Sequence, residues 1–256
     1  MPPTQFDIVT IFPEFFTGPL SYGMVSQAVK KGIAKIRLHD LREFTVDRHR
    51  TVDDRPFGGG EGMVLKPEPM FRAIRNIQSE DSGRTTRVVL LTPQGKRFTQ
   101  ELASHFSTYD QLVLICGRYE GVDQRVVDAL VDDEVSIGDY VLSGGELAAC
   151  VLMDSIIRLL PGVLNNQSST INESFSLVIQ DTETDTPYPL LDCPHYTRPE
   201  DFEGVKVPDV LLSGDHAKIR QWRRKKALEK TLKNRPDLLE YDVLSEEDKR
   251  LLNSKF

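Results

Sequence analysis

The chain lacks the features of a membrane-bound, secreted or disulfide-rich protein. None of its apolar runs approaches the roughly 18 residues of a membrane-spanning helix, and its first residues show no basic-then-apolar secretion signal. We therefore expect no membrane partner and a cytoplasmic location. The three cysteines, Cys116, Cys150 and Cys193, have neither the spacing of a metal site nor the even number of a disulfide framework. Reduced thiols and no metal centre are expected.

A phosphate-binding Gly-x-x-x-x-Gly-Lys-Ser/Thr string is also absent, which argues against a nucleotide hydrolase. The net charge of −7 taken alone disfavours a nucleic-acid partner. However, residues 216–235 hold nine Lys or Arg and one acidic residue. Asp215 is placed to cap this segment and Pro236 to end it, so a single cationic helix is expected. Its imbalance of charge favours phosphate contacts, with a merely solvated helix face as the alternative.

The first half of the chain alternates strand-like and helix-like segments. Short apolar runs predict strands at 6–11, 34–38, 87–91, 112–116 and 134–137. Helices are expected between them at 22–31, 67–78, 99–106 and 123–131, and after them at about 145–160, with Asp123 as a helix cap. This rhythm predicts an α/β fold with a mostly parallel sheet and helices on both faces. The 256 residues, 39% of them hydrophobic, are enough for a sizeable core.

Two glycine-bearing loops, residues 116–121 and 136–146, each follow a predicted strand. Because the ends of parallel strands meet at one edge of the sheet, the loops are expected to form a pocket there, largely from backbone atoms. Tight turns are the alternative. Cys116 beside the first loop is interpreted as a buried strand-end residue rather than a nucleophile, and His195 as a residue of a turn.

Ordered segments of the chain resemble the bacterial tRNA (guanine-37-N1)-methyltransferases. This family belongs to the knotted SPOUT class and uses S-adenosylmethionine. The matching segments are 47–60, 93–95, the two glycine loops, 157–164, 190–199 and 211–216. The resemblance implies a homodimer with a trefoil knot that grips the cofactor, and a magnesium requirement. It implies methyl transfer to N1 of guanine 37 in tRNAs with guanine at 36, a modification that guards the reading frame.

The resemblance divides the chain into three parts. Residues 1–164 would form the knotted catalytic domain, 165–189 a flexible linker or lid of polar composition, and 190–256 a small all-helical domain that binds tRNA. Two rival functions remain: a SPOUT methyltransferase that acts on another RNA base or on ribose, and a non-catalytic tRNA-binding protein.

The family chemistry needs a base that removes the N1 proton and a cation that stabilises the charge on O6. By resemblance the cation is Arg158, and the base is Glu173, which stands where the family has aspartate. Its extra methylene adds about 1.5 Å of reach, and an error of about 1 Å can cost on the order of 10²-fold in rate.

Further roles are also implied by the resemblance alone. Glu120 would balance the cationic groups of the cofactor, with an ion pair to Arg118 or Arg125 as the alternative. The implied cofactor-binding residues are Pro93, Gln94, Gly95, Gly117, Tyr119, Glu120, Ser136, Ile137, Gly138, Asp139, Tyr140, Val141, Leu142, Gly144 and Gly145. The implied tRNA-binding residues are Asp53, Arg55, Gly62, Ser174, Lys218, Arg220, Arg223 and Arg224.

Overall fold

The computed structural model describes residues 2–80, 83–164, 173–175, 188–239, 242 and 244–254. The chain forms two compact units, Met1–Asn165 and Asn166–Phe256. In the described part of the chain, no helix combines the length and the apolar character needed to cross a membrane.

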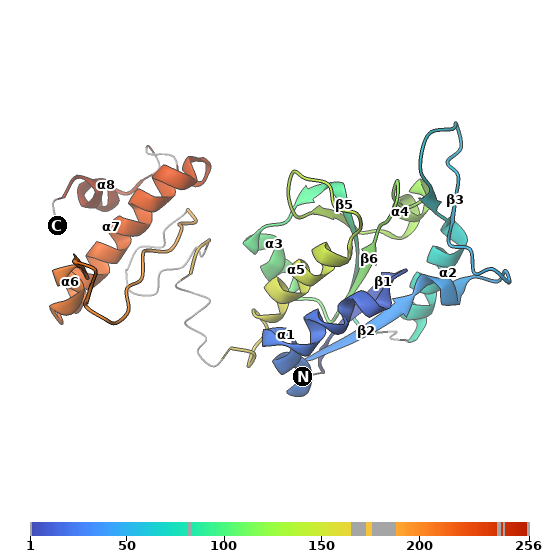
Figure 1. Cartoon of the computed structure of the whole chain (residues 1–256), viewed down its shortest axis with the longest axis horizontal. Helices are drawn as coiled ribbons and strands as arrows, with labels where there is room; N and C mark the ends of the chain where they lie inside the picture. Colours follow the sequence, from blue (N-terminus) through green and yellow to red (C-terminus); the bar gives the residue numbers. More distant parts are fainter. Residues whose placement is uncertain are drawn as a thin grey trace. The chain divides into compact units, whose positions relative to one another are not determined.

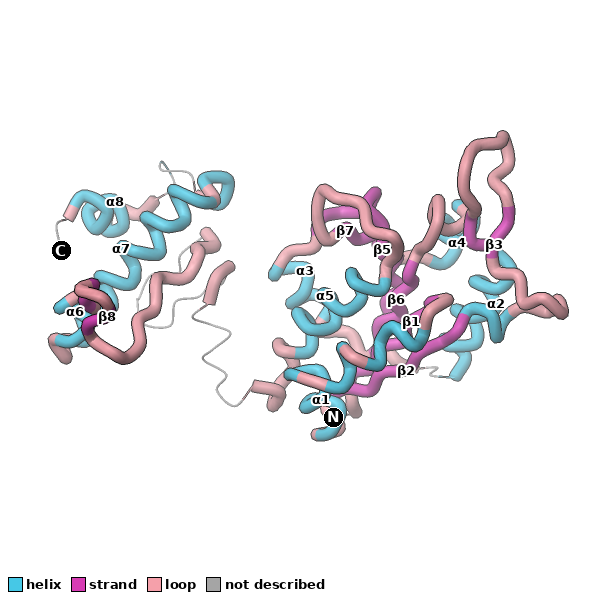
Figure 2. The backbone as a smooth tube through the Cα atoms, viewed as in Figure 1, coloured by secondary structure: helices cyan, strands magenta, loops and turns pink. Residues whose placement is uncertain are grey.

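A five-stranded parallel sheet forms the centre of the first unit (Figures 1 and 2). Its strands lie in the order β2-β1-β6-β5-β7, and every neighbouring pair is parallel. They are β1 (Thr4–Thr10), β2 (Ala34–Asp40), β5 (Thr86–Arg97), β6 (Gln111–Cys116) and β7 (Asp133–Ser136). All five predicted strands are present, four of them within two residues of the expected bounds. The predicted α/β fold with a mostly parallel sheet is confirmed.

Helices cover both faces of this sheet, because the strands are buried and alternate residues point to opposite faces. On one face α1, α3 and α5 pack against Phe6 and Leu114, and on the other face α2 and α4 pack against Val9 and Val113. The helices are α1 (Gly23–Lys30), α2 (Pro67–Glu80), α3 (Gln100–Phe106), α4 (Gln124–Leu130) and α5 (Glu146–Ile157), with single turns η1 (Pro13–Thr17), η2 (Pro19–Ser21) and η3 (Leu41–Phe44). Asp123 caps α4 as expected.

Strand β5 is longer than predicted because the chain leaves the sheet and returns to it. Both Leu91 and Lys96 pair with Val135 of β7, so residues 92–95 stand out from the ladder. Gly95 closes this excursion, since a Cβ atom there would lie 2.3 Å from backbone atoms of Glu134 and Val135. Only glycine allows so close an approach of two backbones.

A two-stranded hairpin, β3 (Asp53–Asp54) with β4 (Val64–Leu65), carries a loop out from the body of the first unit (Figure 1). Four glycines of this loop have positive φ angles: Gly58, Gly59, Gly60 and Gly62. The base of the hairpin is bonded to the first glycine loop. The N–H of Glu120 donates to the carbonyl of Met63, and the N–H of Leu65 donates to the carbonyl of Gly121, both at 2.9 Å.

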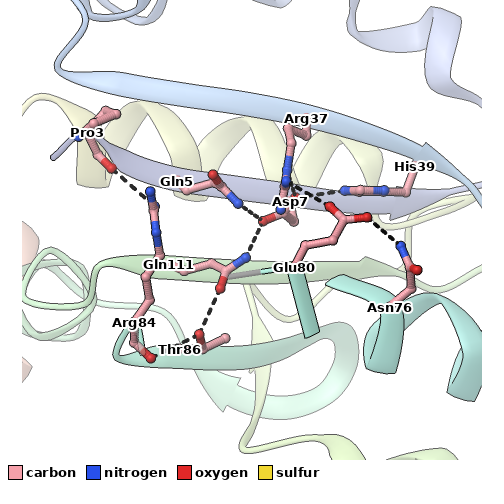
Figure 3. A network of polar contacts seen from close by, with 10 residues as sticks. All are labelled: Pro3, Gln5, Asp7, Arg37, His39, Asn76, Glu80, Arg84, Thr86 and Gln111. Atoms are coloured by element: carbon pink, nitrogen blue, oxygen red, sulfur yellow. Dashed lines mark hydrogen bonds and ion pairs between the residues drawn. The ribbon is translucent and has the colours of Figure 1, made fainter. Parts of the chain in front are cut away.

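A buried carboxylate lies in the middle of the sheet (Figure 3). Asp7 of β1 accepts hydrogen bonds from Arg37 of β2 at 2.6 Å and from Gln111 of β6 at 2.7 Å. Gln5 donates to it at 2.8 Å, and His39 Nε2 lies 2.7 Å away. Burial raises the pKa of this carboxyl, but the hydrogen bonds outweigh burial and hold the pKa well below its usual range. The charged Asp7 therefore ties β1 to both of its neighbours.

The second unit contains one long helix and several short elements. They are β8 (Asp201–Phe202), β9 (Val205–Lys206), α6 (Asp209–Leu212), α7 (His216–Asn234), η5 (Pro236–Leu238) and α8 (Glu246–Asn253). Asp215 caps α7 by accepting the N–H of Lys218 at 3.1 Å, as expected. The β8–β9 pair differs from the expected all-helical domain. Glu203 and Gly204 both have positive φ and form the two-residue turn that joins these strands.

An extended segment that begins at Tyr188 completes the core of the second unit. Tyr188, Leu190 and Cys193 are buried, and they cluster with Ala227 and Leu228 of α7. This segment therefore packs on α7 and forms part of the same core.

Candidate functional site

A cavity of about 170 Å³ opens at the carboxyl ends of β6 and β7, beside the point where β5 leaves the sheet. Its walls come from residues 90–94, from residues 117–122 with Gln124 and Val127 of α4, and from residues 134–138 and 140–145 with Ala148 of α5. Parallel strands bind ligands at this edge of a sheet. The two glycine loops are thus brought together at one cavity, as their positions after strands predicted.

The two loops are joined by backbone contacts. The N–H of Gly145 donates to the carbonyl of Gly117 at 2.9 Å, and Arg118 forms an isolated antiparallel bridge with Gly144. A Cβ at position 145 would lie 2.8 Å from the Cα of Cys116. The loops can approach this closely because glycine occupies the point of contact.

Side chains strengthen the same junction. Arg118 bonds to the buried Glu146 of α5, with Nη2 and Nε 2.8 and 3.2 Å from the carboxylate oxygens. Its Nη1 donates to the carbonyl of Ser143 at 3.1 Å, and Thr10 donates to Glu146 at 2.8 Å. The guanidinium also lies 4.6 Å from the centre of the Phe12 ring. Arg118 therefore holds the loops together, and its charge is balanced within the protein.

Glu120 is an acidic residue among those that line the cavity. Arg118 and Arg125, the two ion-pair partners considered for Glu120, are bound to other acids. Arg118 pairs with Glu146 and Arg125 with Asp123, both at 2.8 Å. An anionic group at this wall suits a cationic ligand.

The structure brings thirteen of the fifteen predicted cofactor residues to the cavity. They are Pro93, Gln94, Gly117, Tyr119, Glu120, Ser136, Ile137, Gly138, Tyr140, Val141, Leu142, Gly144 and Gly145. Gly95 and Asp139 are not lining residues. Gly95 packs on β7 instead, and the exposed Asp139 forms an ion pair with Arg97 at 2.5 Å.

Several lining residues were missed by sequence reasoning. Gln124 and Val127 come from α4, and Thr92 and Glu134 come from strand segments beside the loops. The signal that could have found Thr92 is its place directly after a predicted strand. Nothing in the sequence marks α4 as a wall of the cavity, because its approach depends on tertiary packing.

The cysteines are not poised for nucleophilic chemistry. Burial, with a contribution from the nearby Glu146 carboxylate, raises the pKa of the Cys116 thiol well above its usual range. Burial likewise raises the pKa of Cys150 to about 11. A thiol that stays protonated is a poor nucleophile, which supports the interpretation of Cys116 as a buried strand-end residue.

The two predicted catalytic residues lie in different units. Arg158 is half-buried at the C-terminal end of α5 in the first unit. Glu173 belongs to the second unit. Next to it, Ser174 Oγ accepts the N–H of Asp192 at 3.0 Å.

The predicted RNA contacts of the first unit lie on the β3–β4 hairpin. Asp53 is in β3, and the exposed Arg55 follows that strand. Gly62 lies against the side chain of Glu120, since a Cβ there would be 2.5 Å from Oε1. The hairpin thus reaches the wall of the cavity.

The residues of α7 that were predicted to contact RNA differ in how far they are buried. Arg220 and Arg223 are exposed, and Lys218 is an exposed residue that pairs with Asp215 at 3.3 Å. Arg224 differs from the expectation. Its side chain is only 10% exposed and bonds to Asp248 at 2.6 Å, so it holds α7 to α8.

One group of side chains in the described part of the chain has the arrangement of possible metal ligands: Asp192, Cys193 and His195. His195 Nε2 lies 2.8 Å from the Asp192 carboxylate. Burial, followed by Asp192, raises the pKa of the Cys193 thiol to about 11. The His195–Asp192 contact fits the turn interpretation of His195.

Comparisons with known proteins match nearly the whole chain to one family of methyltransferases. The family model "tRNA (Guanine-1)-methyltransferase TrmD" matches residues 4–241. A tRNA (guanine-N(1)-)-methyltransferase of Koribacter versatilis is 54% identical in an alignment 255 positions long that covers 97% of each chain. Proteins of the same name from Dictyoglomus turgidum and Geobacter sulfurreducens are 52% and 49% identical over 97% of this chain and 95% and 96% of theirs.

The chain belongs to this family. It is a methyltransferase, and the TrmD-family match includes the glycine loops, Arg158, Glu173 and all of α7. The resemblance seen in the sequence is confirmed.

Proposed function

We propose that the protein transfers a methyl group from S-adenosylmethionine to N1 of guanine 37, next to the anticodon, in tRNAs with guanine at position 36. The observation that carries this proposal is the glycine-loop cavity at the carboxyl ends of β6 and β7, in a chain whose residues 4–241 match the TrmD family. By the family's role, the modification supports reading-frame maintenance.

The cavity suits S-adenosylmethionine in three respects. The glycine loops offer backbone N–H and C=O groups to a flat base, and Ile137 and Leu142 offer apolar surface to its faces. Glu120 offers a carboxylate to the cationic methionine end of the ligand. When bound, the ligand supplies a methyl group already activated by its sulfonium.

The protein's own residues then remove the N1 proton and stabilise the negative charge on O6. Guanine N1 carries a proton in the neutral base, so it becomes nucleophilic only when that proton is removed. Glu173 accepts this proton. Arg158 stabilises the negative charge that develops on O6 as the proton leaves.

The RNA is held by both units in this proposal. Asp53, Arg55 and Gly62 of the β3–β4 hairpin hold the guanines at 36 and 37, and Ser174 contacts the same part of the RNA. Arg220, Arg223 and Lys218 of α7 contact the phosphate backbone of the stem, because they are exposed cations on one long helix. An unpaired anticodon base enters a pocket at little cost.

Four further features are part of the proposal. The first unit, predicted as residues 1–164, is knotted, and residues 165–189 act as a lid, although most of that segment lies outside the described residues. The protein works in the cytoplasm. It forms a homodimer, for which the exposed apolar side chains of α5 give support: Leu147 and Val151 are 52% and 44% exposed.

The magnesium ion expected from the family has no matching donor set in the described part of the chain. Magnesium prefers oxygen ligands, whereas the only described ligand group, Asp192 with Cys193 and His195, includes a thiol and an imidazole. We assign no step to magnesium.

The proposal is tested by mass-spectrometric mapping of a tRNA transcript with guanines at 36 and 37 after incubation with purified protein and S-adenosylmethionine. We expect N1-methylguanosine at 37 with the wild type and its near-complete loss with Glu173→Gln. Methylation that survives in the variant would remove Glu173 from its role as the base.

Absence of methylation at 37 by the wild type would contradict the proposed function. A methyl group found elsewhere would indicate a SPOUT enzyme with another target. A protein that binds the tRNA without methylating it would be a non-catalytic RNA-binding protein.

A further inference from the structure

A short segment that carries the proposed base is attached to the second unit. The N–H of Phe175 donates to the carbonyl of Leu190 at 2.7 Å, and Ser174 Oγ accepts the N–H of Asp192 at 3.0 Å. These two hydrogen bonds join residues 173–175 to residues 190–192.

Residues 190–192 are in turn fixed to α7. Leu190 is 6% exposed and packs in the core that includes Leu228. The N–H of Leu191 donates to Oγ1 of the fully buried Thr231 at 2.9 Å. The 173–175 segment is therefore connected to α7 through buried contacts.

The end of α7 makes a third contact with this segment. Arg235, directly after the helix, places its guanidinium 5.9 Å from the centre of the Phe175 ring, which is within the range of a cation–π interaction. Phe175 has a φ of 69°. An aromatic residue keeps this left-handed conformation only where its surroundings hold it.

We propose that Phe175 and Arg235 are positioning residues for Glu173, an inference that rests on the proposed role of Glu173 as the base. The ring, the guanidinium and the two backbone bonds fix the segment that carries the carboxylate. Because α7 also carries Arg220 and Arg223, the phosphate contacts and the base then belong to one rigid part. RNA that docks correctly on α7 brings guanine N1 within reach of the Glu173 carboxylate. RNA that docks differently leaves N1 out of its reach.

Loss of the contact should slow the chemistry without weakening binding. Glu173 keeps its carboxylate in such variants but occupies a wider range of positions. A displacement of about 1 Å can cost on the order of 10²-fold in rate. We expect single-turnover rates to fall roughly 10- to 100-fold in Phe175→Ala and Arg235→Ala.

The experiment uses the full-length protein and a tRNA transcript with guanines at 36 and 37. Single-turnover rates and dissociation constants for the transcript and for S-adenosylmethionine are measured for the wild type and both alanine variants. Phe175→Tyr and Arg235→Lys keep the ring and the cation, and they should restore most of the rate. Arg250→Ala, which removes an exposed arginine of α8, is the matched control and should leave the rate unchanged.

A second readout does not depend on activity. Hydrogen exchange should show protection of the Phe175 and Asp192 amides in the wild type and faster exchange in the alanine variants, with thermal unfolding as the check on folding. Unprotected amides in the wild type would overturn the proposal. So would a wild type that methylates guanine 37 while both alanine variants keep its rate, or lose only RNA affinity.

If the wild type does not methylate guanine 37, the proposed function fails. The positioning of Glu173 fails with it as a catalytic claim, while the exchange data still decide whether the segment is anchored.

Discussion

A methyl group added at Gly145 should force the two glycine loops apart. The backbone at this position has φ −78° and ψ −6°, which alanine adopts without strain. The cost comes only from space, since the new Cβ would lie 2.8 Å from the Cα of Cys116 and 3.1 Å from the N of Gly117. Ordinary carbon contacts are about 3.5–4.0 Å, so the loops must separate by roughly 1 Å.

The magnitude follows from the cost of overpacking. Extra methyl groups in tightly packed positions cost about 1–3 kcal/mol. If the loops must return to their native distance to bind the cofactor, this energy appears as a rise of about 5- to 150-fold in the dissociation constant of S-adenosylmethionine. If they cannot return, part of the cost appears as lower stability of the free protein.

Isothermal titration calorimetry with S-adenosylmethionine, together with thermal unfolding, measures both parts. Gly18→Ala is the matched control, because Gly18 also has helical angles, φ −69° and ψ −61°, and a Cβ there would meet no atom within 4 Å. We expect the control to keep the affinity and to be slightly stabilised. A Gly145→Ala protein that binds the cofactor and unfolds like the wild type would refute the packing argument.

Two other substitutions test the buried charges. Asp7→Asn should lower the free energy of unfolding by about 3 kcal/mol at pH 7, because it leaves Arg37 without its buried partner. Since the folded-state pKa of Asp7 is lowered, its stabilisation is full above the ordinary pKa of about 3.9 and is lost below it, so urea titrations should show the difference shrinking as the pH falls under about 4. On α7, Arg224→Met should reduce stability through loss of the Asp248 bond, whereas Arg220→Ala should leave stability unchanged and reduce the salt dependence of tRNA binding by about one phosphate contact. Equal effects of the two α7 variants on stability would contradict this division.

The sequence was sufficient for the elements that local patterns determine. Strand β6 reads as a continuous apolar run because it lies at the centre of the sheet, buried on both faces. Asp123 and Asp215 cap the helices that follow them, as side-chain chemistry predicts. The ends of the strands then placed both glycine loops at one cavity.

The sequence was insufficient where a tertiary contact decides the role of a residue. The return of β5 to β7 depends on pairing of Lys96 with Val135, and no local pattern distinguishes it from a loop. Asp7 lies between the apolar residues Phe6 and Ile8, and its four hydrogen-bonding neighbours come from three different strands. The role of Gly95 in packing against β7, rather than lining the cavity, has the same origin.

The cationic segment shows how burial changes the meaning of a charge count. Nine Lys or Arg in residues 216–235 suggest a helix that is basic all round, but Arg224 bonds to Asp248 and the buried Lys225 bonds to the carbonyl of Ser254. A buried cation is retained only with such partners, so these two residues fasten α7 to α8 and to the residue that follows α8. The cations that remain exposed include Arg220 and Arg223. Phosphate contacts of this protein are therefore to be sought on the exposed face of α7, and the rigidity of that face is supplied by the basic residues that point inward.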